Sequence, residues 1–160
     1  MQEIRRRVVD RLKDPVNDLY PDLVPGGVWD RALKRGETSP GNTNSAFYKD
    51  PGGIVRLHRT IVVIGPNEVE PVDGPRRGEA ILRNGFLRLF YFVEATSSGK
   101  EALDQIDVKV WSLLHDHQET LSTGYPMTLS ALEMTEPVDS EWEGSLVCMR
   151  RFLAEYLRPT

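Results

Sequence analysis

The sequence predicts an α+β domain, in which a mixed, mostly antiparallel sheet containing a β-hairpin packs against a long helix and a short N-terminal helix. Two observations carry this prediction. Asn84-Gly85 separates two apolar runs, and this pair favours the positive φ angles of a tight hairpin turn. The run that follows leads into apolar residues at spacings of three and four, which indicates a helix with one buried face.

Length and composition favour one domain over 1–160, with long loops near 34–53, 65–77 and 135–144. The single cysteine, Cys148, cannot form an internal disulfide, which fits a reducing compartment. No apolar run approaches the roughly 18 residues of a membrane span, and the N-terminus lacks the apolar core of a signal peptide. We therefore expect a soluble, unexported protein with no membrane partner.

The first half of the chain contains a helix and one long strand. Ile4, Val8 and Leu12 space a short first helix, which Asp14-Pro15 should end because proline disfavours helix in the residue before it. Val28-Trp29-Asp30-Arg31 fits a short strand or a bend. After the 34–53 loop, Ile54 to Ile64 predicts a strand that its β-branched run would bury on both faces.

The second half centres on the long helix. Ser98 and Glu101 form a capping box, so the helix should begin at Ser98. Its apolar stripe consists of Leu103, Ile106, Val110, Leu113, Leu114 and His117. A strand is expected over Thr128 to Met134. Ser145 to about Phe152 also favours a strand, although Leu146, Met149, Leu153 and Leu157 fit a helix as well.

The strand before the helix has two apolar faces. Leu87, Leu89, Tyr91 and Val93 alternate toward the helix. The opposite face carries Phe86, Arg88, Phe90 and Phe92, and its three aromatic rings need cover from the first helix or from a second copy of the protein. We treat these four residues as a candidate subunit interface.

Charge is unevenly distributed in a chain of net charge −4. No Lys or Arg lies between Val110 and Met149, whereas basic residues cluster over Arg5 to Lys13 and elsewhere in the first half. Solvated faces would explain both halves. The alternative is that unlike surfaces meet head-to-tail between subunits that close into a ring. The candidate acidic lumen or docking face comprises Glu133, Glu136, Asp139, Glu141 and Glu143.

None of the motifs that could bind a ligand or catalyse a reaction has the residues or the spacing that such a site requires. Gly36 to Thr43 imitates a phosphate-binding loop, but Asn42 stands where the lysine is required. His115 and His117 would diverge on a helix and could not share one metal ion. His58 and Cys148 have no evident catalytic partner. We expect no catalytic, cofactor or metal site, and hence a protein that is not an enzyme.

The order of elements resembles the tail terminator, or tail-completion, proteins of long-tailed bacteriophages. The resemblance rests on the N-terminal helix, the Gly26 to Asp30 segment, the strand at Ile54 to Ile64 and the hairpin. Its most specific part is Phe90 to His117, where a strand enters Glu-Ala-Thr-Ser-Ser-Gly-Lys-Glu-Ala-Leu-Asp and then a helix. A final strand like Leu146 to Tyr156 completes the similarity.

The resemblance implies a ring, expected to be a hexamer, that caps the tail tube, ends its elongation and joins the tail to the head-side connector. Its partners would be further copies of itself, the tail tube protein and the connector or neck protein, with DNA passing through without specific binding. The protein would then be located in the virion at the head–tail junction, after assembly in the host cytoplasm. The 34–53 and 136–144 loops depart from the likeness.

Two alternatives stay open. A head-completion or neck ring protein would share the ring and the loops, and its position in the particle would distinguish it. An unrelated α+β domain that binds a small ligand would need a concave pocket with convergent polar groups. The oligomeric state separates these classes: a phage ring protein should form rings, whereas a ligand-binding domain should be a monomer with a pocket.

Overall fold

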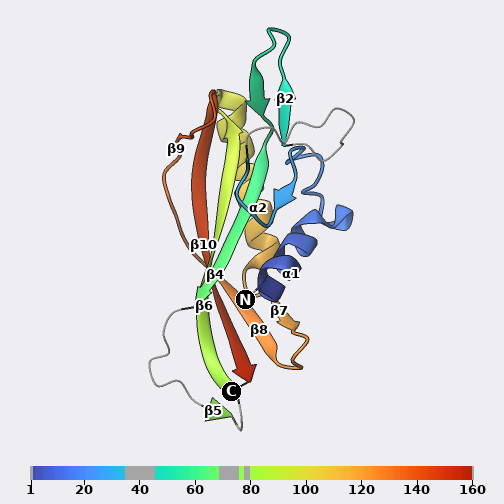
Figure 1. The fold of residues 1–160 in the computed structure, drawn as a ribbon, viewed down its shortest axis with the longest axis vertical. Helices are drawn as coiled ribbons and strands as arrows, with labels where there is room; N and C mark the ends of the chain where they lie inside the picture. Colours follow the sequence, from blue (N-terminus) through green and yellow to red (C-terminus); the bar gives the residue numbers. More distant parts are fainter. Residues whose placement is uncertain (1, 35–45, 69–75, 78–79, 160) are drawn as a thin grey trace.

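The computed structural model describes residues 2–34, 46–68, 76–77 and 80–159, and it has the predicted α+β architecture. A curled, mostly antiparallel sheet is covered on one face by two helices (Figure 1). The helices are α1 (Gln2–Lys13) and α2 (Ser97–Leu114), and a 3-10 turn, η1 (Pro15–Asn17), follows α1. Within these described residues, no helix is both long and apolar enough to cross a membrane.

The main sheet has the strand order β1-β4-β6-β10-β8-β7. Only β1 and β4 run parallel, whereas the other neighbours are antiparallel. The strands are β1 (Val28–Trp29), β4 (Thr60–Glu68), β6 (Ala80–Glu94), β7 (Gln118–Thr120), β8 (Pro126–Met134) and β10 (Ser145–Pro159). Two short strands extend it: β5 (Arg76–Arg77) pairs with β6, and β9 (Val138–Asp139) pairs with β10.

The helices bury most of their predicted stripes against the sheet, although Leu113 of α2 is only partly buried. From α1 the core receives Ile4, Val8 and Leu12, each at most 1% exposed, and the helix ends before Pro15 as expected. From β6 it receives the predicted inward set, Leu87, Leu89, Tyr91 and Val93. Because α2 and β6 supply apolar side chains at their own periods, one continuous core forms between the helices and the sheet.

The prediction of a hairpin turn at Asn84-Gly85 is wrong, because β6 continues through these two residues as a 15-residue strand. Asn84 pairs with Glu155 and Gly85 with Ala154 in an unbroken register with β10. Glycine is needed here for space and not for a turn: a Cβ at Gly85 would lie 2.8 Å from the Cβ of Pro66. Hairpins do occur elsewhere, between β2 and β3 and between β7 and β8.

The single strand predicted at Ile54 to Ile64 is also corrected. It divides into β3 (Val55–Leu57) and the start of β4, which belong to different sheets. β3 instead pairs with β2 (Phe47–Lys49), so part of the predicted 34–53 loop is a hairpin. Positions 35–45, including the phosphate-loop imitation, lie outside the described residues, as do 69–75 of the second loop.

The boundaries of α2 differ from the predicted ones at both ends. Thr96 and not Ser98 is the N-cap, since its hydroxyl oxygen accepts the backbone N–H of Gly99 at 3.1 Å. The helix ends at Leu114, and Asp116, two residues later, has the positive φ of 59° that is typical of a left-handed turn residue. His117 therefore lies outside the helix. The C-terminal segment is the predicted strand, extended to Pro159.

Candidate assembly surface

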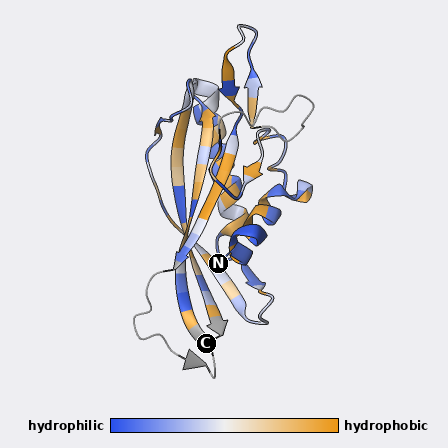
Figure 2. Cartoon of the chain, in the orientation of Figure 1, coloured by the Kyte–Doolittle hydropathy of each residue, from blue (hydrophilic) through white to orange (hydrophobic). Residues whose placement is uncertain are grey.

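The sheet face opposite the helices, called here the outer face, is built by strands β4, β6 and β10. Directly paired residues share a face, so the registers of these strands define it. It consists of Val62, Ile64, Phe86, Arg88, Phe90, Phe92, Val147, Met149, Arg151 and Leu153. Figure 2 shows that apolar residues concentrate in the upper halves of these long strands, whereas the lower halves mix apolar and hydrophilic residues.

The four residues predicted as an interface all lie on the outer face, and each is partly exposed. Phe86 pairs with Leu153, Phe90 with Met149 and Val62, and Phe92 with Val147. The first helix does not cover them, because its buried residues belong to the core on the other side of the sheet.

One end of the outer face is covered by the β2–β3 hairpin and the loop before β10. Phe92 packs in a second apolar cluster with Phe47, Leu57 and Trp142, and the rings of Phe47 and Trp142 meet edge-on at 4.9 Å. At the same end, Arg59 Nε donates to Glu94 Oε2 at 2.9 Å, and this hydrogen bond lowers the pKa of Glu94. Neither cluster includes Phe86 or Phe90.

Arginines stack on the remaining aromatic rings of the outer face. The guanidinium of Arg151 lies 4.6 Å from the ring centroid of Phe86, and that of Arg88 lies 6.0 Å from the ring of Phe90. Such contacts fall within the range of cation–π attraction. The outer face therefore combines partly exposed apolar area with two positive charges.

The predicted acidic residues form a border of this face. Glu133, at the end of β8, lies 2.8 Å from Arg151 Nε, so it joins the outer face directly. Glu136, Asp139, Glu141 and Glu143 follow as exposed residues on and around β9. In Figure 1, β9 lies to the left of the long strands, beside β10, and the basic helix α1 lies to their right. The structure thus brings one acidic residue to the predicted aromatic set and leaves the other four along the edge.

Sequence reasoning missed the exposed tip of the β2–β3 hairpin. Tyr48, Ile54 and Val55 are 40%, 43% and 48% exposed. The signal was present, because the Asp50 to Gly53 turn sequence separates Phe-Tyr-Lys from Ile-Val-Arg. The long-loop interpretation of 34–53 obscured it.

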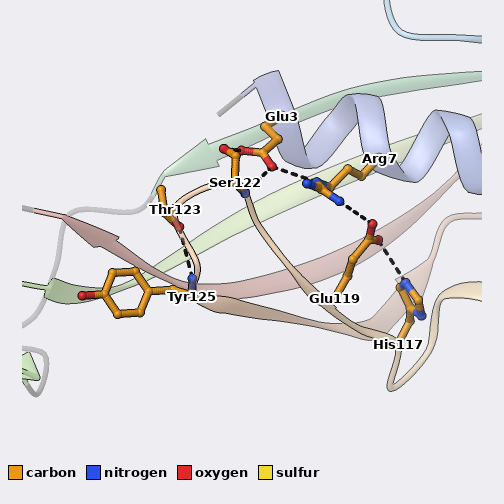
Figure 3. Close-up of polar contacts among 7 residues, drawn as sticks. All are labelled: Glu3, Arg7, His117, Glu119, Ser122, Thr123 and Tyr125. Atoms are coloured by element: carbon orange, nitrogen blue, oxygen red, sulfur yellow. Dashed lines mark hydrogen bonds and ion pairs between the residues drawn. The ribbon is translucent and has the colours of Figure 1, made fainter.

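The helix side of the molecule carries a polar chain that joins α1 to β7 (Figure 3). Arg7 donates from Nε to Glu3 Oε2 at 2.8 Å and from Nη1 to Glu119 Oε1 at 2.7 Å. Glu119 in turn contacts His117 Nε2 at 3.2 Å. Hydrogen bonds from the side chain and backbone of Ser122 hold the pKa of Glu3 at about 2. These groups satisfy one another, as expected for a structural tie between two elements.

The histidines have structural partners, and the cysteine is buried. His115 Nδ1 accepts the backbone N–H of Ala131 at 3.0 Å, and His58 stacks on Tyr48 at 4.3 Å. Burial raises the pKa of the Cys148 thiol to about 12, which makes it a poor nucleophile. Among the residues that the structure describes, no three His, Cys, Asp or Glu side chains are grouped to hold a metal ion.

Two surface cavities bear on the small-ligand alternative. One, of about 490 Å³, lies between α1 and β7, and its lining includes Arg7, His117 and Glu119, which already pair with each other. The other, of about 540 Å³, is a largely apolar hollow beside α2, lined by Leu23 and Val108 with charged neighbours. Neither cavity contains any of the predicted site residues.

Comparisons with known proteins give a fold and no function. No family model matches the chain, and no curated protein matches it. A solved structure, of a protein whose name states no function, superposes with a TM-score of 0.53 over 98% of this chain and 95% of its own, at 11% identity. A likeness at this identity indicates a shared fold alone.

Proposed function

We propose that this chain is a structural subunit that assembles into a ring, caps the tail tube of a long-tailed phage, ends tube elongation and joins the tail to the head-side connector. The ring is a hexamer whose partners are other copies of the chain, the tail tube protein and the connector. DNA passes through it without specific binding, and the ring belongs to the virion at the head–tail junction.

The observation that carries the self-assembly is the outer face. Phe86, Phe90, Met149 and Leu153 form neighbouring cross-strand pairs that are partly exposed. No described helix packs on this face, because both helices contribute their buried residues to the opposite side. A sheet with one face packed normally presents polar side chains to water on the other. An apolar outer face therefore favours a protein contact.

Charge supports a ring in preference to a symmetric pair. The acidic edge at Glu136 to Glu143 includes β9, which lies to the left of the long strands in Figure 1, whereas the basic helix α1 lies to their right. Unlike patches on opposite sides of one molecule suit head-to-tail contacts, which generate a closed ring when the rotation between subunits closes. The phage-tail part of the proposal is supported by the sequence resemblance, which spans Phe90 to His117 most specifically.

The self-assembly is tested by sedimentation and negative-stain imaging of the purified protein at low and high salt. We expect rings of one diameter, with more assembly at low salt, because salt screens exposed charge pairs. Arg88→Glu on the outer face should abolish the rings. Lys100→Glu is the matched control, since it makes the same charge change at an exposed position on α2 and should leave them intact. A wild-type protein that stays monomeric would overturn the proposal.

The place in the phage is tested by removing the coding sequence from an assembling phage and imaging the products. A tail terminator predicts overlong or unattached tails in its absence. Tails of normal length on full heads would contradict the tail-terminator function. Tails of normal length beside heads that have lost their DNA would instead favour the head-completion or neck protein.

A further inference from the structure

We propose that the β2–β3 hairpin of one copy docks against the outer face of the next copy. This inference rests on the ring proposed above and identifies the two surfaces that meet. One surface is the hairpin tip, with Tyr48, Ile54 and Val55, and the other is the part of the outer face that the second apolar cluster leaves open.

The hairpin tip presents apolar side chains to solvent. Its three apolar residues are each at least 40% exposed, and they flank a turn of Asp50, Pro51, Gly52 and Gly53. Tyr48 stacks on His58 and is 40% exposed. Scattered apolar residues are common on protein surfaces, but three on a single short hairpin make a patch.

The base of the hairpin is held firmly, so the tip is presented in a fixed position. Phe47 and Leu57 are 5% and 6% exposed within the second cluster. Asp50 Oδ1 accepts the backbone N–H of Ile54 at 2.9 Å, and its Oδ2 accepts Arg56 Nε at 3.2 Å. These bonds fix the turn without covering the tip. A preordered element loses less conformational entropy on binding than a flexible loop does.

The hairpin does not use its tip within its own chain. It projects beyond the upper end of the main sheet, and the turn points away from the sheet (Figure 1). The open part of the outer face, around the Phe86–Leu153 pair, lies farther along β6 and β10 from Phe92, the residue that packs against the hairpin. Two apolar surfaces at different places on one molecule can pair only between copies. Such a contact is head-to-tail, which is the kind that closes into rings.

The hairpin tip and the outer face are chemically complementary. Arg88 and Arg151 lie against Phe90 and Phe86 on the outer face, and a third aromatic ring, that of Tyr48, is a suitable neighbour for their guanidinium groups. Lys49 is exposed beside the apolar tip, and Glu133 begins the acidic border of the outer face. A neighbour's Lys49 at this border would pair opposite charges at the rim of the contact.

The partner that covers the outer face is a second copy, because both halves of the contact are present in this chain. The tip alone is too small for a stable interface, which buries at least about 1,000 Å² in total. It therefore acts as one part of the subunit contact, and the remainder comes from the edges of the sheet. A shortened or polar tip should weaken the ring without unfolding the subunit.

Cysteine cross-linking tests the pairing directly. Val55→Cys places a thiol on the tip and Leu153→Cys places one on the outer face, whereas the native Cys148 is buried. Under mild oxidation, a mixture of the two variants should give a disulfide-linked dimer that contains one copy of each. Each variant alone should give none. The control is Val55→Cys mixed with Val108→Cys, an exposed position on α2, which should not cross-link.

A second measurement uses a polar tip. Ile54→Ser/Val55→Ser should weaken ring assembly at least tenfold by sedimentation, while the thermal midpoint stays near that of the wild type. Val16→Ser/Val108→Ser removes two still more exposed apolar groups elsewhere and should not weaken it. Rings that assemble normally with the polar tip, or Val55→Cys that cross-links to itself, would overturn the hairpin contact and leave the ring proposal standing. No assembly by the wild-type protein would overturn both.

Discussion

Arg150 on β10 pairs with Asp107 on α2 through two contacts, Nε to Oδ1 at 3.0 Å and Nη2 to Oδ2 at 2.5 Å. Tyr91 donates its hydroxyl to the same Oδ1 at 3.0 Å, and Arg150 Nη1 donates to the carbonyl of Leu132 at 2.7 Å. Burial, followed by the charge of Asp107, raises the pKa of Tyr91 well above its ordinary value. The pair thus links the helix layer to the central strands, and each of the two largely buried charges is compensated by the other.

Asp107→Ala should lower the free energy of unfolding by about 3 kcal/mol, because it leaves the Arg150 guanidinium with little compensation at a largely buried position. Urea unfolding at neutral pH measures the change. Asp104→Ala, at an exposed position on the same helix, is the control and should cost little. Asp107→Ala/Arg150→Met should recover part of the loss. An equal loss in the single and double variants would show that the ion pair is not the cause.

Thr96→Ala should destabilise the fold by about 1 kcal/mol through loss of the cap on α2. Ser98→Ala should be close to neutral, because Ser98 is exposed within the first turn and is not the N-cap. Thermal melting of the two variants side by side distinguishes them. A larger effect at Ser98 than at Thr96 would mean that the helix begins later than described.

Gly85→Ala should destabilise the fold by about 1 to 3 kcal/mol, since its Cβ would press on Pro66 in the neighbouring strand. Asn84→Ala should change stability little, because Asn84 is exposed in the middle of β6. The unfolding midpoints in urea provide the comparison. A hairpin turn at this position would instead make both residues important.

The lowered pKa of Glu3 predicts that the protein loses stability in acid. Its pKa is held at about 2, below the ordinary value of 4.5, by hydrogen bonds from Ser122 and then by Arg7. A lowered carboxyl pKa stabilises the folded state above pH 4.5, and this contribution is lost as the pH falls from 4.5 toward 2. Glu3→Gln should therefore be less stable than the wild type at pH 7, and the difference should shrink toward pH 2. Glu101→Gln, at an exposed position on α2, is the control for the removal of one surface carboxylate.

The sequence predicted the features that depend on periodicity. The α+β class, the stripe of α1 and the inward set of β6 all follow from side-chain spacing, which local backbone geometry imposes. The failures came from residues whose role is tertiary. Gly85 looked like a turn residue, yet it is needed where Pro66 approaches, and no local pattern reveals that approach. The alternation of side chains correctly placed Phe86, Arg88, Phe90 and Phe92 on one face of the strand. That Trp142 and Phe47 partly cover this face could not be predicted, because the contact depends on the tertiary fold.

The central position of β10 has a consequence for how the protein is made. β10 lies between β6 and β8, and it follows every other described strand along the chain. Until it has been synthesised, the nascent chain carries β6 and β8 with unpaired edges, which are sites of aggregation. Its pairing joins Glu94 to Ser145 and Ala80 to Pro159, contacts distant in sequence that are slow to form. The sheet therefore cannot be completed before β10 is present, and a chain interrupted at Gly144 should require chaperones to stay in solution.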